Sequence, residues 1–223
     1  MKKSDDLWVF GYGSLMWRPG FAFLQALPGQ VIGFQRAFCI YSTHHRGSER
    51  RPGLVLGLDR GGSCSGMVYR VSHEHRLEAI RYLRAREQVS GVYREALLPV
   101  TIGHDQAVTA VTYVVERAHP SYVHRLPISR QVDIIRGARG RSGPNVEYLV
   151  NTTKHLRALD IRDPSIERLA VAAGGLFAAP HADADVLQRR AHALPRLCRA
   201  GVVPRPQLRP NERRRFLYRL ALA

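Results

Sequence analysis

The sequence predicts an α+β fold whose sheet is antiparallel or mixed and can curl into a barrel. Three observations support this prediction. Short apolar segments separated by glycine-bearing turns fill most of residues 7–116. One helical pattern interrupts them at residues 72–87, and helical patterns replace them after residue 128. Strands grouped around one inserted helix and followed by further helices are typical of α+β domains.

The predicted strands are short and bounded by glycine or polar residues. They cover residues 7–10, 30–41 (as one strand or two), 54–58, 66–71, 94–102 and 107–116. The Gly61–Gly62 pair is expected to form a turn, and residues 43–52 a polar loop. The last strand is apolar at both alternating sets of positions, so we expect both of its faces to be covered.

A helix is predicted directly after the fourth strand. Ser72 is a suitable N-cap, and Leu77, Ile80, Leu83 and Glu87 follow at spacings that place them on one helical face. Three more helices are expected in the last third of the chain. They cover residues 128–136, a segment from Pro144 to about residue 159, and a short segment opened by Asp163–Pro164.

Composition indicates one domain, residues 1–171, followed by a basic tail, residues 172–223. The chain has 223 residues, of which 45% are hydrophobic, which is enough for one core. The formal net charge is +16, and this favours nucleic-acid binding as one alternative. Much of the excess lies in the tail, where arginines are frequent and periodicity is poor, so the charge does not characterise the main domain. We therefore expect no nucleic-acid partner.

The sequence favours a cytoplasmic protein. No window approaches the roughly 18 apolar residues of a membrane helix. Met1–Asp6 begins like a signal peptide, but two aspartates interrupt it and the apolar run that follows is too short. Cys39, Cys64 and Cys198 are few and far apart, which is typical of a reducing compartment.

The turn after the first strand is a candidate ligand site. Gly11 and Gly13 flank Tyr12 and precede Ser14 and Leu15. Glycines let a backbone approach a ligand closely, and successive N–H groups in such a turn can bind an anion. The turn lacks the remaining features of dinucleotide and phosphate loops. Taken alone, the signal favours an ordinary tight turn over a ligand site.

Glu87 is the candidate acid or base. It continues the apolar face of its predicted helix near the C-terminal end, where burial and the helix dipole both disfavour a charged carboxylate. Both effects raise its pKa toward the range of a general base. Pairing with Arg84 or Arg86 would oppose that shift, and a structural ion pair at the helix end is the alternative.

No metal or cofactor site is expected. His73 and His75 are two positions apart on a helix and point to different faces, while the adjacent His44 and His45 diverge in a loop. No recognised zinc motif is present. Cys39 lies within an apolar strand, so we expect a core residue rather than a nucleophile.

Several motifs in a fixed order over residues 7–170 resemble one known family. They are LWVFGYGSLMWRP (7–19), GFQRAFC (33–39), STHHRG (42–47), RPGL (51–54), GMVYR (66–70), REQVSGVY (86–93) and SGPNVEYL (142–149). In this order they resemble the ChaC-like, glutathione-specific γ-glutamylcyclotransferases. One departure is His44, where some members carry aspartate. The resemblance implies a small β-barrel flanked by helices.

The same resemblance implies an activity and its residues. The enzyme would cleave glutathione to 5-oxoproline and Cys-Gly without a cofactor, with Glu87 as the catalytic acid/base. The residues expected to bind substrate are Tyr12, Gly13, Ser14, Leu15, Arg46 and Tyr148. The alternatives are an enzyme acting on other γ-glutamyl amines, a nucleic-acid-binding module, and a non-catalytic regulator that kept the fold.

Overall fold

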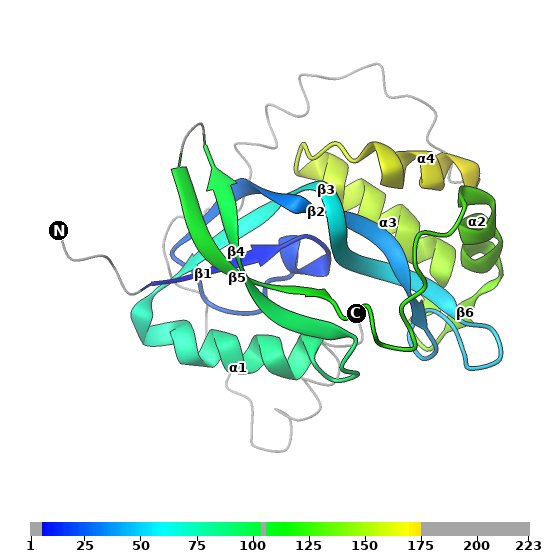
Figure 1. Ribbon diagram of the computed structural model, residues 1–223, viewed down its shortest axis with the longest axis horizontal. Helices are drawn as coiled ribbons and strands as arrows, with labels where there is room; N and C mark the ends of the chain where they lie inside the picture. The colour runs from blue at the N-terminus through cyan, green and yellow to red at the C-terminus, as the bar shows by residue number, and fades with distance from the viewer. Residues whose placement is uncertain (1–5, 104–105, 175–223) are drawn as a thin grey trace.

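The computed structural model describes residues 6–103 and 106–174, and its centre is a closed five-stranded barrel (Figure 1). Around the barrel the strands follow the order β1-β3-β2-β4-β5. All hydrogen-bonded neighbours are antiparallel except β1 and β5, which run parallel where Val9 pairs with Val111. The strands are β1 (Leu7–Gly11), β2 (Gln25–Ser42), β3 (Gly53–Val71), β4 (Tyr93–Ile102) and β5 (Gln106–Val115). The barrel is therefore mixed, and the predicted fold class is confirmed.

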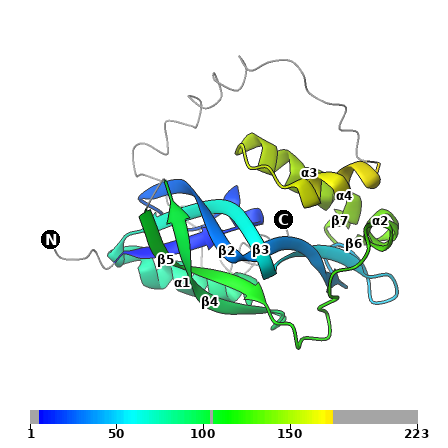
Figure 2. The same cartoon turned by 45° about the horizontal axis from the view of Figure 1, so that its top comes forward.

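Four α-helices surround this barrel. α1 runs along one side of it, whereas α2, α3 and α4 gather over the far part of β2 and β3 (Figures 1 and 2). The helices are α1 (Arg76–Glu87), α2 (Ile128–Gly137), α3 (Asn145–Ala158) and α4 (Pro164–Ala172), and a two-stranded ribbon of β6 (Arg139–Gly140) and β7 (Gly143–Pro144) precedes α3. The predicted opening of α4 is confirmed, because the Asp163 side chain accepts a hydrogen bond from the N–H of Ile166.

The hairpin of β2 and β3 corrects one sequence prediction. Residues 54–58 and 66–71 belong to a single strand rather than to two strands joined by a turn. Gly61 and Gly62 do have positive φ, at +112° and +62°, and they lie opposite Gly33, at +86°, where the pairing register shifts. The glycines therefore form a bulge that bends one long strand.

Long β2 and β3 strands contribute to two hydrophobic cores. The part of these strands that belongs to the barrel contributes Val31, Leu58 and Val68 to its interior, and each of these residues is at most 1% exposed. The other part of the two strands extends under α2, α3 and α4, where Leu54 of β3 packs in one cluster with Leu149 of α3. Burying one such aliphatic side chain contributes about 1.5–3 kcal/mol. This arrangement joins the barrel to the helical layer.

The buried face of α1 differs from the predicted one. Leu77 is 62% exposed, whereas Ala79 and Leu83 are buried. Ala79, Leu83 and Glu87 are spaced four residues apart, so they form one stripe that turns toward the barrel. Glu87 thus continues the buried face, although that face does not include Leu77.

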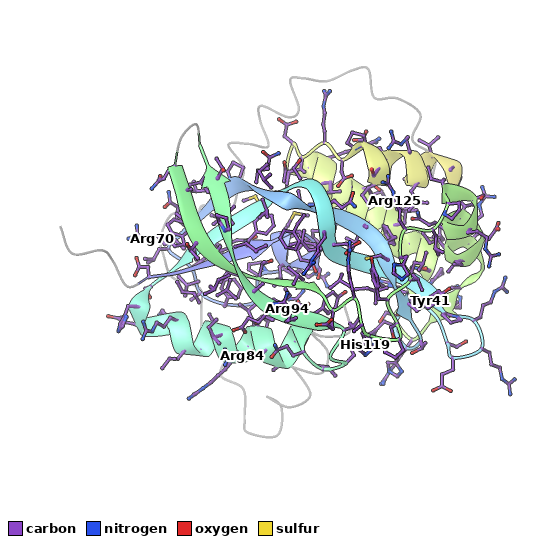
Figure 3. The ribbon with its side chains drawn as sticks, viewed as in Figure 1. Tyr41, Arg70, Arg84, Arg94, His119 and Arg125 are labelled. Carbon is purple, nitrogen blue, oxygen red and sulfur yellow. The ribbon has the colours of Figure 1, made fainter. Side chains whose placement is uncertain are left out.

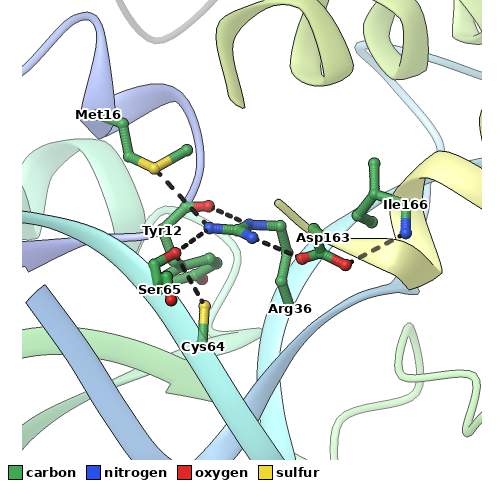
Figure 4. A network of polar contacts seen from close by, with 7 residues as sticks. All are labelled: Tyr12, Met16, Arg36, Cys64, Ser65, Asp163 and Ile166. Atoms are coloured by element: carbon green, nitrogen blue, oxygen red, sulfur yellow. Dashed lines mark hydrogen bonds and ion pairs between the residues drawn. The ribbon is translucent and has the colours of Figure 1, made fainter. Parts of the chain in front are cut away.

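A buried arginine connects the turn after β1 to the helical layer (Figure 4). Arg36, on β2, is 4% exposed and donates hydrogen bonds to the backbone carbonyls of Tyr12 and Ser65. Its Nη1 also lies 2.6 Å from Oδ2 of Asp163. The same aspartate caps α4, so one cation fixes the turn, the barrel and the last helix together.

The described residues contain no helix that combines the length and apolar character of a membrane span. The predicted basic tail, residues 172–223, overlaps the described part of the chain only in its first three residues, and Cys198 lies outside that part.

Candidate active site

The turn between β1 and the following 3-10 helix (Ser14–Met16) is fixed by its backbone and by close packing. The N–H of Met16 donates to the carbonyl of Gly13 at 2.9 Å. A Cβ on Gly11 would lie 2.9 Å from Cβ of Leu15, whereas a Cβ on Gly13 would meet only Leu56 Cδ1, at 3.7 Å. Gly11 is therefore required by the fold, and Gly13 leaves open backbone that a ligand can approach.

Glu87 is the last residue of α1, and its side chain is 17% exposed. Burial raises the pKa of this carboxyl above its ordinary value, and the neighbouring Arg86 partly opposes the shift. The carboxylate Oε1 lies 3.2 Å from Nε of Arg86. Arg84, the other expected partner, instead pairs with Glu95 at 2.8 Å (Arg84 is labelled on α1 in Figure 3). The buried position predicted for Glu87 is thus present.

Arg86 also connects the end of α1 to the turn. Its Nη2 donates to Oγ of Ser14 at 2.7 Å, and its Nη1 donates to the carbonyl of Arg18 at 2.9 Å. Oε1 of Glu87 lies 3.2 Å from Nε of the same guanidinium, so these contacts hold its carboxylate near the turn. Residues 14 and 87 are far apart in sequence, and the fold unites them at one place.

Three tyrosines from different elements surround Glu87. Burial raises the pKa of Tyr12, Tyr93 and Tyr148, and the charge of Glu87 raises all three further. The pKa of Tyr148 is raised to about 12 in total. The Tyr93 hydroxyl donates to the carbonyl of Leu56 at 2.6 Å. These tyrosines therefore stay neutral at physiological pH and can donate or accept hydrogen bonds near the carboxylate.

Sequence reasoning did not select Tyr93 as a site residue. The available signal was its place at the end of the REQVSGVY motif, six residues after Glu87. Tyr93 lies one residue before the predicted strand 94–102, so the strand pattern assigned it no role. The short connection from α1 keeps Tyr93 near Glu87, and the fold turns its hydroxyl toward β3, where it donates to the carbonyl of Leu56.

Arg46 reaches this tyrosine cluster through Tyr148. Its guanidinium carbon lies 5.5 Å from the centre of the Tyr148 ring, and Nη1 donates to the carbonyl of Pro144 at 3.3 Å. Oε2 of Glu147 lies 4.0 Å from the same Nη1. The loop after β2 and the start of α3 thus meet at these two predicted residues, and Arg46 lies behind Tyr148 rather than against Glu87.

The histidines and cysteines follow a different arrangement. The rings of His44 and His45 pack edge to face, 5.1 Å apart. Among the described residues, no three side chains of the His, Cys, Asp and Glu types are grouped as metal ligands would be. Burial raises the pKa of Cys39 to about 12, so its thiol is protonated and a poor nucleophile.

A cavity of about 240 Å³ lies elsewhere, between β2 and the helices α2 and α4. Phe38, Asp59 and Gln131 contribute to its lining, but none of the predicted site residues does. Asp59 is held by Arg117 and Tyr122, so the carboxylate in this lining is already paired. We therefore base the candidate site on the groups around Glu87.

The arrangement around Glu87 suits proton transfer next to an anchored ligand. A carboxyl with a raised pKa is a stronger base than an ordinary carboxylate, and it can return the proton that it takes up. The turn beside it presents backbone N–H groups, which can bind a carboxylate or a developing negative charge on oxygen. Neutral tyrosine hydroxyls complete the polar surroundings. These are the parts of an acid/base catalyst for a small polar substrate.

Comparison with known proteins finds relatives over most of the described chain. A family model described as "ChaC-like protein" matches residues 7–173. The chain is 31% identical to the glutathione-specific γ-glutamylcyclotransferase of Escherichia coli over 77% of this chain and 74% of that protein. It is 38% identical to glutathione-specific γ-glutamylcyclotransferase 1 of Mus musculus over 77% of this chain and 79% of that protein.

The fold is also similar to a solved structure. A crystal structure of the γ-glutamylcyclotransferase specific to glutathione from yeast superposes with a TM-score of 0.69. The match covers 80% of this chain and 100% of that one, with 22% sequence identity. At this identity the likeness establishes the fold alone.

Proposed function

Because this chain belongs to the ChaC-like protein family, we propose that it is a γ-glutamylcyclotransferase that cleaves glutathione into 5-oxoproline and Cys-Gly. The observation that carries the proposal is the placement of Glu87. A mostly buried carboxyl with a raised pKa lies beside the glycine-bearing turn, within a shell of neutral tyrosines. The names of the relatives supply the substrate, and the geometry supplies a group able to carry out the chemistry.

The reaction is an internal transfer of the γ-glutamyl group. The α-amine of the substrate attacks its own γ-carbonyl carbon, a five-membered lactam forms, and the amide bond to cysteine breaks. Attack within one molecule already has a high effective concentration, so the enzyme mainly has to hold the chain folded and move protons. No electrons are transferred, so we propose that no redox cofactor takes part.

Glu87 moves the proton in both directions. As the carboxylate it removes a proton from the α-ammonium group, which makes the amine nucleophilic. As the resulting acid it returns a proton to the departing amide nitrogen, so Cys-Gly leaves as an amine. The second proton that the attacking nitrogen loses as the lactam forms then converts this amine to its ammonium form. Acid/base catalysis of this kind contributes on the order of 10²–10⁴-fold to a rate. A raised pKa suits the first role, because it makes the carboxylate a stronger base than an ordinary glutamate.

Residues Tyr12–Leu15 would bind the γ-glutamyl group. Open backbone at Gly13 allows close approach, and N–H groups of the turn can donate hydrogen bonds to the α-carboxylate or to the oxyanion formed on attack. Tyr148 would line the same site with its neutral hydroxyl, and Arg46 would support the ring from behind. We also place the enzyme in the cytoplasm, where glutathione keeps protein thiols reduced.

The test is release of 5-oxoproline from a panel of substrates by the purified protein. Glutathione and γ-glutamyl amino acids would be compared at equal concentration, with Glu87→Gln as the control for catalysis. We expect glutathione to be cleaved fastest. Preference for another γ-glutamyl amine would correct the substrate, and absence of 5-oxoproline from every substrate would refute the activity.

A further inference from the structure

The side chain of Arg86 is engaged at all three of its nitrogens. It is 11% exposed, so these contacts are made largely away from solvent. Nη2 donates to Ser14 Oγ, Nη1 donates to the Arg18 carbonyl and to the Tyr82 hydroxyl, both at 2.9 Å, and Nε faces Glu87 Oε1. One planar group therefore links α1, the turn and the segment that follows the 3-10 helix.

The contact with Ser14 has a consequence for substrate binding. A hydroxyl can accept two hydrogen bonds but donates only one. Because Ser14 Oγ accepts from Arg86, its own proton has to point elsewhere. Among the residues that the structure describes, no acceptor is bound by that proton. The hydroxyl is thus left as a donor on the turn that we assign to the γ-glutamyl group.

We propose that Arg86 is a positioning residue, which holds the Glu87 carboxylate beside the turn and orients the Ser14 hydroxyl toward the substrate. This inference rests on the proposed function. It assigns two separable roles to one side chain. The shape of the guanidinium sets the positions of Ser14 and Glu87, and its charge sets how readily Glu87 ionises.

The charged and titratable groups around Glu87 support the second role. Arg86 is the single described cation that lowers the pKa of this carboxyl. The other facing groups are tyrosines from the turn, β4, β5 and α3, and burial keeps each of them neutral. They are Tyr12, Tyr93, Tyr113 and Tyr148. Removing Arg86 would therefore leave the carboxylate with no charged partner in this shell.

Three variants separate shape from charge. Arg86→Gln removes the charge and most contacts, and Arg86→Lys keeps the charge but cannot reach several oxygens at once. Arg84→Gln is the matched control, because Arg84 lies on the same helix but pairs with Glu95. The measurements are kcat and KM for glutathione across pH, and the pKa of Glu87 by ¹³C NMR of the ligand-free protein.

We expect Arg86→Gln to raise the pKa of Glu87. We also expect the acidic limb of the pH profile of kcat/KM to shift to higher pH in this variant. We expect Arg86→Lys to keep both near the wild-type position while kcat/KM falls about 10–100-fold, as for loss of charge-assisted hydrogen bonds. Arg84→Gln should match the wild type in every measurement. Thermal unfolding checks that each variant is folded. If Arg86→Gln does not fold, the proposal is tested by kcat/KM of Arg86→Lys compared with that of the control Arg84→Gln.

The proposal is overturned if folded Arg86→Gln retains the wild-type acidic limb and Glu87 pKa. It is also overturned if Arg86→Lys retains full kcat/KM. Failure of the proposed function would look different, because the wild type would then release no 5-oxoproline while the NMR titration would still report whether Arg86 controls Glu87.

Discussion

Arg36 and Asp163 lie 127 positions apart in the chain, yet their side chains form an ion pair of 2.6 Å between the barrel and α4. The arginine side chain is 1% exposed and the aspartate side chain 15%. The same guanidinium donates to the carbonyl of Tyr12, the first residue of the proposed substrate turn. The last described helix therefore helps to fix the position of the site.

Replacing Arg36 with methionine should destabilise the protein strongly. The change leaves Asp163 and the carbonyls of Tyr12 and Ser65 without their donor in a largely buried place. Breaking a buried pair by removing one partner costs about 3–5 kcal/mol. Urea unfolding measures this cost, and Arg60→Met, at an exposed position of β3, serves as the control. Equal stability of the two variants would contradict the role given to Arg36.

Replacing Glu87 with glutamine should abolish most turnover while the fold is retained. The amide has nearly the same shape but cannot take up the α-ammonium proton, so kcat should fall on the order of 10²–10⁴-fold. Steady-state release of 5-oxoproline measures the loss, and binding of glutathione measured by calorimetry should persist. Glu78→Gln, on the same helix with a side chain 83% exposed, should remain fully active. Normal turnover by Glu87→Gln would remove Glu87 from the mechanism.

The same variant should be more stable than the wild type at neutral pH. Burial raises the pKa of Glu87 in the folded state, so the folded protein holds this proton more tightly than the unfolded chain. The stabilisation by the protonated form is complete below the unfolded pKa and is lost as pH rises through the folded pKa. We expect Glu87→Gln to unfold at a higher temperature at pH 8, and the difference to shrink toward pH 4. A constant difference across pH would argue against a raised pKa.

The sequence was most informative where local chemistry decides structure. The strand before Gly11 and the Asp163 cap followed from short-range rules, because each depends on neighbouring residues. The position of Glu87 on a buried stripe was also predictable from helical spacing. The prediction that Leu77 lies on the buried face was wrong. Periodicity alone does not tell which of two overlapping stripes of a helix the barrel will cover. Ala79, a small residue, lies on the face that approaches the barrel.

Long-range relationships were outside the reach of the sequence pattern. The Gly61–Gly62 pair indicates a departure from regular strand geometry, but only the pairing with β2 determines that it is a bulge. The choice of Arg86 rather than Arg84 as the partner of Glu87 depends on where Ser14 and Glu95 lie in space.

Two glycines of one turn should respond differently to substitution. A Cβ on Gly11 would lie 2.9 Å from Cβ of Leu15, so Gly11→Ala should lower the unfolding temperature. A Cβ on Gly13 would make only ordinary contact with Leu56, at 3.7 Å. Gly13→Ala should therefore keep much of the wild-type stability and raise KM for glutathione, because the added methyl group intrudes on the ligand. An unchanged KM in Gly13→Ala would contradict the assignment of this turn to substrate.

Removing residues 175–223 should leave both stability and activity close to those of the whole chain. α4 ends at Ala172, and its last carbonyls already have a partner, because Arg136 donates to those of Ala172 and Ala173. Ile166, one of the buried residues of α4, packs in the core shared with β2 and β3. A longer deletion that begins at Asp163 is the comparison, because it removes both this core residue and the partner of Arg36.

Thermal unfolding and 5-oxoproline release, measured on both truncated proteins, distinguish the two. We expect the shorter deletion to retain both properties and the longer one to lose cooperative unfolding, since an unpaired buried arginine and exposed core side chains are both costly. Loss of folding on the shorter deletion would show that the basic tail belongs to the domain, and the boundary proposed near residue 171 would then be wrong.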